Sequence, residues 1–510
     1  MSPDDFPSCR SNGQRRRPSA HAWLLASIVI TLAGCADTVP RAAAPGSQPQ
    51  IPARWLQQDA SANGIGNSNS SAADAAALAQ WWRLFEDAEL SRLIETALRA
   101  NTSIRGAEAA LRQARALRDV SAAGLLPALS GSASAQRSRS GQASSTASYK
   151  AGFDASWEPD LFGANSAAVD TTEAGARASA ASLADVQVSV AAEVALAYIT
   201  LRGSQQRLAI AQANLDSQLE TLQITQWRLQ AGLTTALEAE QARASVEQTH
   251  ATLPGLQTSL AQAGHALAAL TGQTAQALLP LSQNSAAVPQ PRLDLTLAIP
   301  ADTLRQRPDV RAAEASLAAA FSKTRQADAA RKPSLRLSGT LGLGAGSLSG
   351  LSDSSALLRT LLASIALPIF DGGALNAQLR AAQAAAEQSR TAYEASILTA
   401  LREVEDALVA LRGDRARLAR LQLASEAAAN AALLARQRYG SGLVDFQTVL
   451  ETQRTLLNTQ DGVASAAASV SADHVRLYKA LGGGWQPEAS AVGSTSQAPA
   501  LPAPNSDSRS

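Results

Sequence analysis

The sequence holds 510 residues, and its 44 basic and 43 acidic side chains leave a formal net charge of +1, which excludes attraction to nucleic acid through bulk charge. It contains only 4 histidines, and no nucleophile elbow, phosphate-binding loop or metal-ligand spacing accompanies them. We therefore expect no enzyme, and no metal or other cofactor.

The first 34 residues have the pattern of an export signal. Three arginines at 15–17 precede an apolar run over 23–32 that is too short to cross a bilayer as a helix. The Leu-Ala-Gly-Cys sequence that follows resembles the lipobox of bacterial lipoproteins. Residues 1–34 are therefore predicted to be a lipoprotein signal peptide, and Cys35 the lipidated first residue of the mature chain. An ordinary signal peptide with an incidental cysteine is the alternative.

The segments that follow the signal and end the chain are poor in core residues. Removal of the signal would also remove Cys9, so no disulfide is expected in the mature protein. Ala36 stands where lipoproteins of the inner membrane typically carry Asp, which favours the outer membrane. Residues 35–75 and 486–510 are rich in Ser, Pro, Ala, Gly and Asn, and are expected to be a lipidated flexible tether and a disordered tail.

Residues 125–158 predict a β-hairpin. Phe153 and Trp157 fall on one face of the second strand, and Lys150 and Asp154 fall on the other. Strands of about ten residues with one apolar face are typical of a transmembrane barrel wall, although a soluble sandwich edge is the alternative. No segment after the signal offers 18 or more consecutive apolar residues, so we expect strands to make any membrane crossing.

A long helix is predicted directly after this hairpin, over residues 163–230. No proline interrupts this stretch, and about 70 residues at a rise of about 1.5 Å give a rod near 100 Å. Large apolar residues recur at every seventh position, which indicates supercoiled neighbours. The companion positions are small or polar, which favours a wide wall of helices over a two-stranded zipper, with a rod-like coiled coil as the alternative. The heptad positions are Val194, Leu201, Leu208, Leu215, Leu222 and Leu229.

The second half of the chain repeats this plan. Matching motifs lie 206 residues apart near the first helices and 210 apart further on. A hairpin over 333–368 and a long helix over 372–440 correspond to those of the first half, which predicts an internal two-fold repeat over 76–290 and 291–485. A duplication this long is an architectural unit rather than a short solenoid repeat.

The four predicted strands cannot close into a barrel. The smallest transmembrane barrels need about eight strands. An open edge in lipid would leave unpaired backbone groups that cost several kcal/mol each. Several copies must therefore share one barrel, and cyclic symmetry is the usual arrangement.

Four motifs give the chain a resemblance to the outer-membrane factor family, the TolC-like exit ducts of bacterial efflux and secretion systems, and above all to its lipoprotein branch around OprM and NodT. The resemblance implies a mainly α fold with a transmembrane β portion: a homotrimer with a 12-stranded β-barrel in the outer membrane, continued by a long periplasmic α-helical barrel. An equatorial region would come from the segments near 76–100 and 273–310 and the end of the folded chain. The motifs are Trp157-Glu-Pro-Asp-Leu-Phe-Gly163, Leu367-Pro-Ile-Phe-Asp-Gly-Gly373, Arg438-Tyr-Gly-Ser-Gly442 and Leu477-Tyr-Lys-Ala-Leu-Gly-Gly-Gly-Trp485.

The same resemblance implies a gate at the periplasmic tip. Its acidic position matches Glu451, with Arg454 one turn later on the same helix face, and Tyr439 lies in the turn itself. Relatives often carry Asp at the Glu451 position and an apolar residue at the Gln447 position, so this chain would have a narrower charged ring and no apolar plug. A solvated helix surface is the alternative. The first copy has Leu229, Gln241 and Ala244 opposite Tyr439, Glu451 and Arg454, so the gate is expected where the copies differ.

The function implied by the resemblance is that of a passive exit channel in a tripartite efflux system. Substrates would pass unchanged from a periplasmic adaptor and an inner-membrane pump of the RND type, across the periplasm and the outer membrane. A periplasmic coiled-coil adaptor or scaffolding lipoprotein is the alternative. Adaptors normally carry one helical hairpin with compact β-domains, rather than two repeats of hairpin and rod.

Overall fold

The computed structural model describes residues 78–139, 141, 144–291 and 301–485. The predicted signal peptide, the tether with Cys35 and the tail after residue 485 lie outside the described residues.

Two helices of equal length dominate the fold. α5 (Ala164–Gln230) and α10 (Ala374–Gly440) each contain 67 residues, about 100 Å of helix. Each begins after a glycine in the left-handed conformation, and an acidic side chain upstream accepts hydrogen bonds from the first backbone amides. Asp160 binds the amide of Ser166 at 2.7 Å, and Asp371 binds that of Leu375 at 2.7 Å. The motifs around these aspartates are therefore helix start signals.

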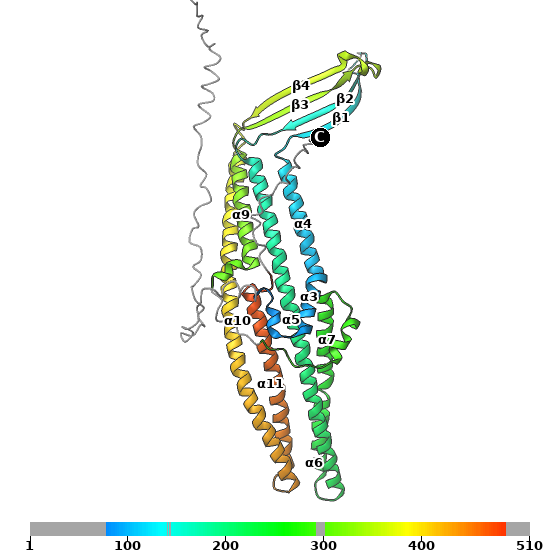
Figure 1. Ribbon diagram of the computed structural model, residues 1–510, viewed down its shortest axis with the longest axis vertical. Coiled ribbons are helices and arrows are strands. Elements are labelled where there is room, and N and C mark those ends of the chain that lie inside the picture. The colour runs from blue at the N-terminus through cyan, green and yellow to red at the C-terminus, as the bar shows by residue number, and fades with distance from the viewer. Residues whose placement is uncertain (1–77, 140, 142–143, 292–300, 486–510) are drawn as a thin grey trace, which may run out of the picture. The chain divides into compact units, whose positions relative to one another are not determined.

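The two hairpins form one antiparallel sheet in the order β1 (Ala128–Ser138), β2 (Thr146–Trp157), β3 (Ser334–Ala345) and β4 (Leu357–Ala366). β2 pairs with β3 and so joins the two copies of the repeat. Figure 1 shows the four strands side by side, with β1 and β4 at the edges. Within the described chain, the outer edges of β1 and β4 have no strand partner.

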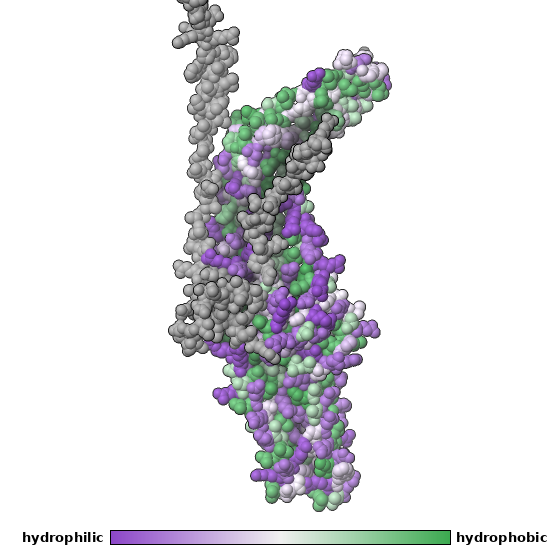
Figure 2. All heavy atoms as spheres, in the orientation of Figure 1, coloured by the Kyte–Doolittle hydropathy of each residue, from purple (hydrophilic) through white to green (hydrophobic). Residues whose placement is uncertain are grey.

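The sheet is exposed and has faces of different polarity. Phe153, Leu341 and Leu361 are 59%, 53% and 87% exposed on one face. On the other face, the Ser132 hydroxyl donates to Asp154 at 2.9 Å. Hydrophobic residues are prominent over the strands in Figure 2. The alternation expected from the sequence is present, and one chain alone leaves its apolar face uncovered.

Four helices lie side by side next to the sheet (Figure 1). α4 (Thr102–Ala123) packs on α5, α5 packs on α9 (Pro308–Ala329), and α9 packs on α10. Towards their other ends, α5 and α10 turn into returning helices. The first return is divided into α6 (Ala236–His250) and α7 (Leu253–Thr271), where Pro254 begins a new helix, whereas α11 (Phe446–Ala480) is continuous.

A belt of short elements surrounds the middle of the long helices. It contains η1 (Trp81–Phe85), α3 (Ala88–Ala100), η2 (Ala275–Leu278), α8 (Leu279–Gln283) and η4 (Ala301–Gln306). Trp81 and Tyr478 are fully buried, and their rings stack with centroids 5.6 Å apart. The apolar residues of α5 between 190 and 201 complete this core. The belt is formed by the segments that the family resemblance implied.

The expectation that no segment after the signal is apolar enough to cross a membrane as a helix was too strict. α5 contains an 18-residue stretch with a mean hydropathy of 1.4, which by length and composition is sufficient for a membrane span. Within the protein, 39% of that stretch is buried. Scattered small and polar residues break every consecutive apolar run in α5, which is why counting such runs missed this stretch.

Gly152 provides a test of the sheet, because it faces Gly342 across the centre of the β2–β3 pair. A Cβ at Gly152 would lie 2.6 Å from the Gly342 Cα, whereas a Cβ at Gly131 would have its nearest neighbour, Phe153 Cε1, at 3.7 Å. Gly152→Ala is therefore expected to lower severalfold the amount of folded protein in outer-membrane fractions, measured as the heat-modifiable band in gels. The control Gly131→Ala is expected to leave this amount unchanged. Equal yields from both variants would contradict this account of the sheet.

Candidate gate at the helical tips

The two tips at which α5 and α10 turn back have the same backbone. The Arg228 carbonyl accepts from Leu233 at 2.8 Å, and the Arg438 carbonyl accepts from Leu443 at 2.9 Å. Each turn contains a glycine with positive φ. Leu233 and Leu443 at the apices are 69% and 74% exposed. The repeat thus produces two equivalent turns, each with an exposed leucine at its apex.

The second tip is fastened to the first by Tyr439. Its hydroxyl donates to Glu238 on α6 at 3.1 Å, and the Arg228 guanidinium lies over its ring at 4.5 Å. The Arg228 Nη1 also donates to the Tyr439 carbonyl at 3.3 Å. The Phe446 ring packs 5.4 Å away. We call Arg228, Glu238, Tyr439 and Phe446 the tip clasp, since they join the two helical hairpins at their ends.

The clasp depends on a neutral tyrosine. Burial raises the pKa of Tyr439 above its usual range, and the hydrogen bond to Glu238 also raises it. The phenol therefore keeps its proton at neutral pH and remains a donor to the Glu238 carboxylate.

Above the clasp, α5 and α11 meet along a stripe of mostly polar residues. Its members alternate at spacings of three and four, which is the seam pattern of a coiled coil. Most coiled coils fill such positions with large apolar residues, but this seam has only one alanine among polar side chains. We call it the polar seam, and its α5 members are Ser204, Arg207, Ala211, Asn214, Gln218, Thr221 and Thr225.

Direct polar contacts cross the seam at successive heptads. Arg207 pairs with Asp461 through two hydrogen bonds of 2.6 and 3.1 Å. The Asn214 amide donates to Gln460 at 2.9 Å. Further down, the Gln453 amide donates to the Thr221 hydroxyl at 3.0 Å. From α10, Arg436 pairs with Glu220 at 3.5 Å and contacts the Ser217 hydroxyl.

This arrangement corrects the expected role of the leucine heptads. Val194 and Leu201 are fully buried, but Leu208, Leu215 and Leu222 are only half-buried and Leu229 is 36% exposed. The companion positions Ser204 and Ala211, which are small or polar, are the buried ones. A helix in a wall has neighbours on two sides, and below residue 203 the leucines do not lie on the side that faces α11.

The predicted gate residues of α11 lie on an exposed face. Gln447, Glu451 and Arg454 are all exposed, while Phe446, Leu450 and Gln453 are buried against the neighbouring helices. Within the described chain, no hydrogen bond or ion pair joins the side chains of Glu451 and Arg454, although they lie on one face. Tyr439 is the one predicted gate residue that the structure brings into contact with the other copy.

The other partners of the clasp and the seam were missed from the sequence. These partners are Arg228, Glu238, Arg207 and Asp461. Their signal was present in the alternating spacing of three and four between residues 204 and 228. The evenly spaced leucines beside this pattern form a second, more apolar stripe on the same helix.

Comparison with known proteins identifies the family. The profile of the outer membrane efflux protein family matches residues 93–273 and 299–483, one match in each copy of the repeat. The chain belongs to the outer membrane efflux protein family. The resemblance to the outer-membrane factors is thereby confirmed.

Characterised relatives support the same assignment. The chain is 34% identical over 420 residues to the pyoverdine export outer membrane protein OpmQ of Pseudomonas putida, covering 80% of this chain and 88% of the relative. It is 32% identical over 473 residues to the toluene efflux pump outer membrane protein TtgF of the same species, covering 91% and 97%. Nodulation protein T of Rhizobium leguminosarum is 30% identical over 419 residues, which cover 82% and 86% of the two chains.

Solved structures share the fold. The outer-membrane channel OprN superposes with a TM-score of 0.78 at 36% identity, covering 80% of this chain and 93% of that one. The outer membrane protein VceC of Vibrio cholerae superposes with a TM-score of 0.75 at 27% identity, covering 80% and 99%. The mainly α, TolC-like fold is confirmed.

This family member is an outer-membrane efflux channel. The matched relatives are named as outer-membrane components of efflux and export, and the matched structures include outer-membrane channels. The adaptor alternative therefore has no support, and the family and its neighbours are channel proteins rather than enzymes. Among the described residues, no group of three or more His, Cys, Asp or Glu side chains is placed to hold a metal ion.

Proposed function

We propose that three copies of this chain form the exit duct of a tripartite efflux system. Three four-stranded sheets supply twelve strands, which closes the edges of β1 and β4 and exceeds the roughly eight strands that the smallest barrels require. Three sets of long helices continue the duct through the periplasm. Cargo passes along it without chemical change.

The gate of this duct is a ring of Glu451 and Arg454 side chains, with Gln447 one turn nearer the tip. One observation carries the assignment: these side chains are exposed on α11, while the adjacent face of the same helix is held by the polar seam. In a cyclic assembly, Glu451 of one copy and Arg454 of another can pair across the opening. Such pairs are charge-assisted and strengthen in a narrow, poorly hydrated pore.

Opening would separate α11 from α5 along the polar seam. The Arg207 and Asp461 side chains are 40% and 37% exposed, and partly exposed ion pairs of this kind contribute about 0.2–1 kcal/mol each. The contacts can therefore break one after another. The tip clasp is the last contact on this line and holds the closed position.

The proposed partners are a periplasmic adaptor and an inner-membrane pump of the RND type. The exposed leucines at the two turn apices, Leu233 and Leu443, support end-on docking of an apolar adaptor surface. Six such apices in a trimer would form a ring with near six-fold symmetry, because the two turns share one backbone.

We further propose that a covalent lipid on Cys35 anchors the mature chain to the outer membrane. Cys35→Ser is expected to abolish incorporation of labelled palmitate, since no other cysteine remains after removal of the signal. Labelling that persists in this variant would contradict the anchor.

Single-channel conductance in planar bilayers tests the gate. Glu451→Ala and Arg454→Ala remove opposite halves of the charged ring, so each is expected to raise the conductance of the purified channel severalfold. Gln241→Ala is the matched control, because Gln241 holds the position of Glu451 in the first copy. An unchanged conductance in both gate variants, or an equal rise in the control, would contradict the assignment.

A further inference from the structure

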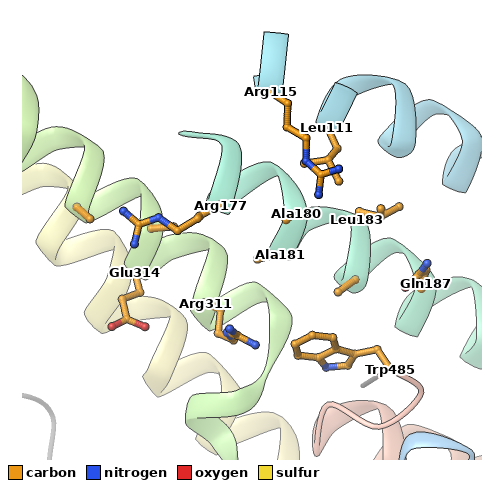
Figure 3. Close-up of a pocket in the computed structure, with 13 residues that line it drawn as sticks. Leu111, Arg115, Arg177, Ala180, Ala181, Leu183, Gln187, Arg311, Glu314 and Trp485 are labelled. Carbon is orange, nitrogen blue, oxygen red and sulfur yellow. The ribbon is translucent and has the colours of Figure 1, made fainter. Parts of the chain in front are cut away.

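A pocket of about 610 Å³ lies between the two copies of the repeat, among α4, α5, α9 and the end of the described chain. Alanines of α5 and α9 form much of its lining, which leaves space that larger side chains would fill. Figure 3 shows arginines from three different helices around it, together with the Trp485 ring. A volume of this size is typical of a site for a drug-sized organic molecule. Nothing in the channel function described above uses this pocket.

The line of ion pairs that joins these helices stops at the pocket. Nearer the sheet, Arg118 of α4 pairs with Glu173 of α5 at 3.4 Å. Arg325 of α9 pairs with Asp170 of α5 at 2.7 Å. One turn beyond Glu173, the next charged residue of α5 is Arg177, so the pocket has an arginine where its neighbours have an acid.

Positive charge is therefore in excess around the pocket. Arg115 of α4, Arg177 of α5 and Arg311 of α9 line it, and Glu314 is the only acidic residue of the lining. Within the described chain, none of the three arginines forms an ion pair with a carboxylate. Their side chains are exposed, so solutes can reach them from water. Arginine binds carboxylates through two parallel hydrogen bonds, and this lining therefore favours an anionic ligand.

Trp485 gives the same pocket an aromatic wall. The turn that presents it is fixed, because the Gly484 amide donates to the Leu78 carbonyl at 3.1 Å and Gly484 has a φ of +103°. The Arg311 guanidinium lies over the ring, 5.3 Å from its centroid. The ring and the alanines thus offer apolar surface beside the guanidinium groups. A ligand that uses both is an anion with a flat apolar body.

We propose that this pocket binds a water-soluble aromatic carboxylate. Its carboxylate pairs with Arg115 and Arg177, and its ring lies against Trp485 and the alanines. The bound anion continues the line of ion pairs between α4 and α5. An anionic lipid is a poorer fit, because Ala180 in the lining lies 16 residues into α5, about 24 Å from the helix end next to the sheet.

Fluorine NMR of the purified full-length protein in a neutral detergent tests the site. The probe is para-(trifluoromethyl)benzoate, whose resonance broadens on binding, and its uncharged amide measures uptake by detergent and by the apolar sheet. The carboxylate is expected to show saturable broadening that the amide lacks. Arg115→Gln and Arg177→Gln are each expected to raise the Kd of the probe roughly three- to tenfold, because each removes a charge-assisted contact that is partly screened by water.

Two further variants separate the pocket from surface charge in general. Ala180 is exposed and lines the pocket, so Ala180→Leu fills the space without changing any charge and is expected to raise the Kd at least threefold. Arg112→Gln removes an exposed arginine of α4 that lies outside the lining, and is expected to leave the Kd unchanged. The heat-modifiable band in gels checks that each variant is folded.

Four results would overturn the proposal. They are the absence of saturable broadening with the wild type, equal broadening of the carboxylate and the amide, an unchanged Kd in both arginine variants, and an unchanged Kd in Ala180→Leu. Competition identifies the source of the anion. Unlabelled benzoate is expected to displace the probe, and displacement by short-chain dihexanoyl phosphatidylglycerol at lower concentrations than by benzoate would assign the pocket to a lipid and contradict the proposal.

Discussion

The unpaired edges of β1 and β4 are the constraint on which the rest of this protein depends. A four-stranded sheet with one apolar face is unstable alone in lipid, because its edge amides and carbonyls have no water to bind. The duplication places two hairpins in one chain but does not remove the edges, so the sheet has to be completed by other copies. The long helices adjoin the sheet and must then form a wall rather than a closed bundle.

The helical wall uses two kinds of contact for two purposes. In the belt, Trp81, Tyr478 and Leu201 are fully buried, and burial of such side chains is worth about 1.5–3 kcal/mol each. Below residue 203, the contact between α5 and α11 is polar, and its Arg207–Asp461 ion pair and its side-chain amide hydrogen bonds are individually weak. The belt therefore holds the chain together while the tips can separate. The change from apolar to polar contacts occurs within continuous helices, α5 and α11, so each must be long enough to span both regions.

Much of this architecture could be predicted from the sequence, because the period of a pattern reports its element directly. Alternation of apolar and polar residues and the internal repeat predicted the hairpins over 125–158 and 333–368, and long stretches without proline predicted α5 and α10. Which neighbouring helix covers each face of the long helices could not be predicted in the same way. Leucines at every seventh position show that a helix has an apolar face, but not which neighbour covers it. The contact of Tyr439 with Glu238 and Arg228 joins residues about 200 positions apart, and no local pattern reports such a distance.

Disulfide cross-linking between sheet edges tests the central claim most directly. In a Cys35→Ser background, each variant carries one cysteine at Ala133 in β1 and a second on the apolar face of β4. A disulfide between these cysteines would link neighbouring copies in the assembled barrel. The β4 positions tested in turn are Leu357, Leu361, Ala363 and Ile365. The account predicts a ladder of linked chains that ends at three in outer-membrane fractions for at least one of these pairs. Chains that remain single at every position, or a ladder that ends at another number, would contradict it.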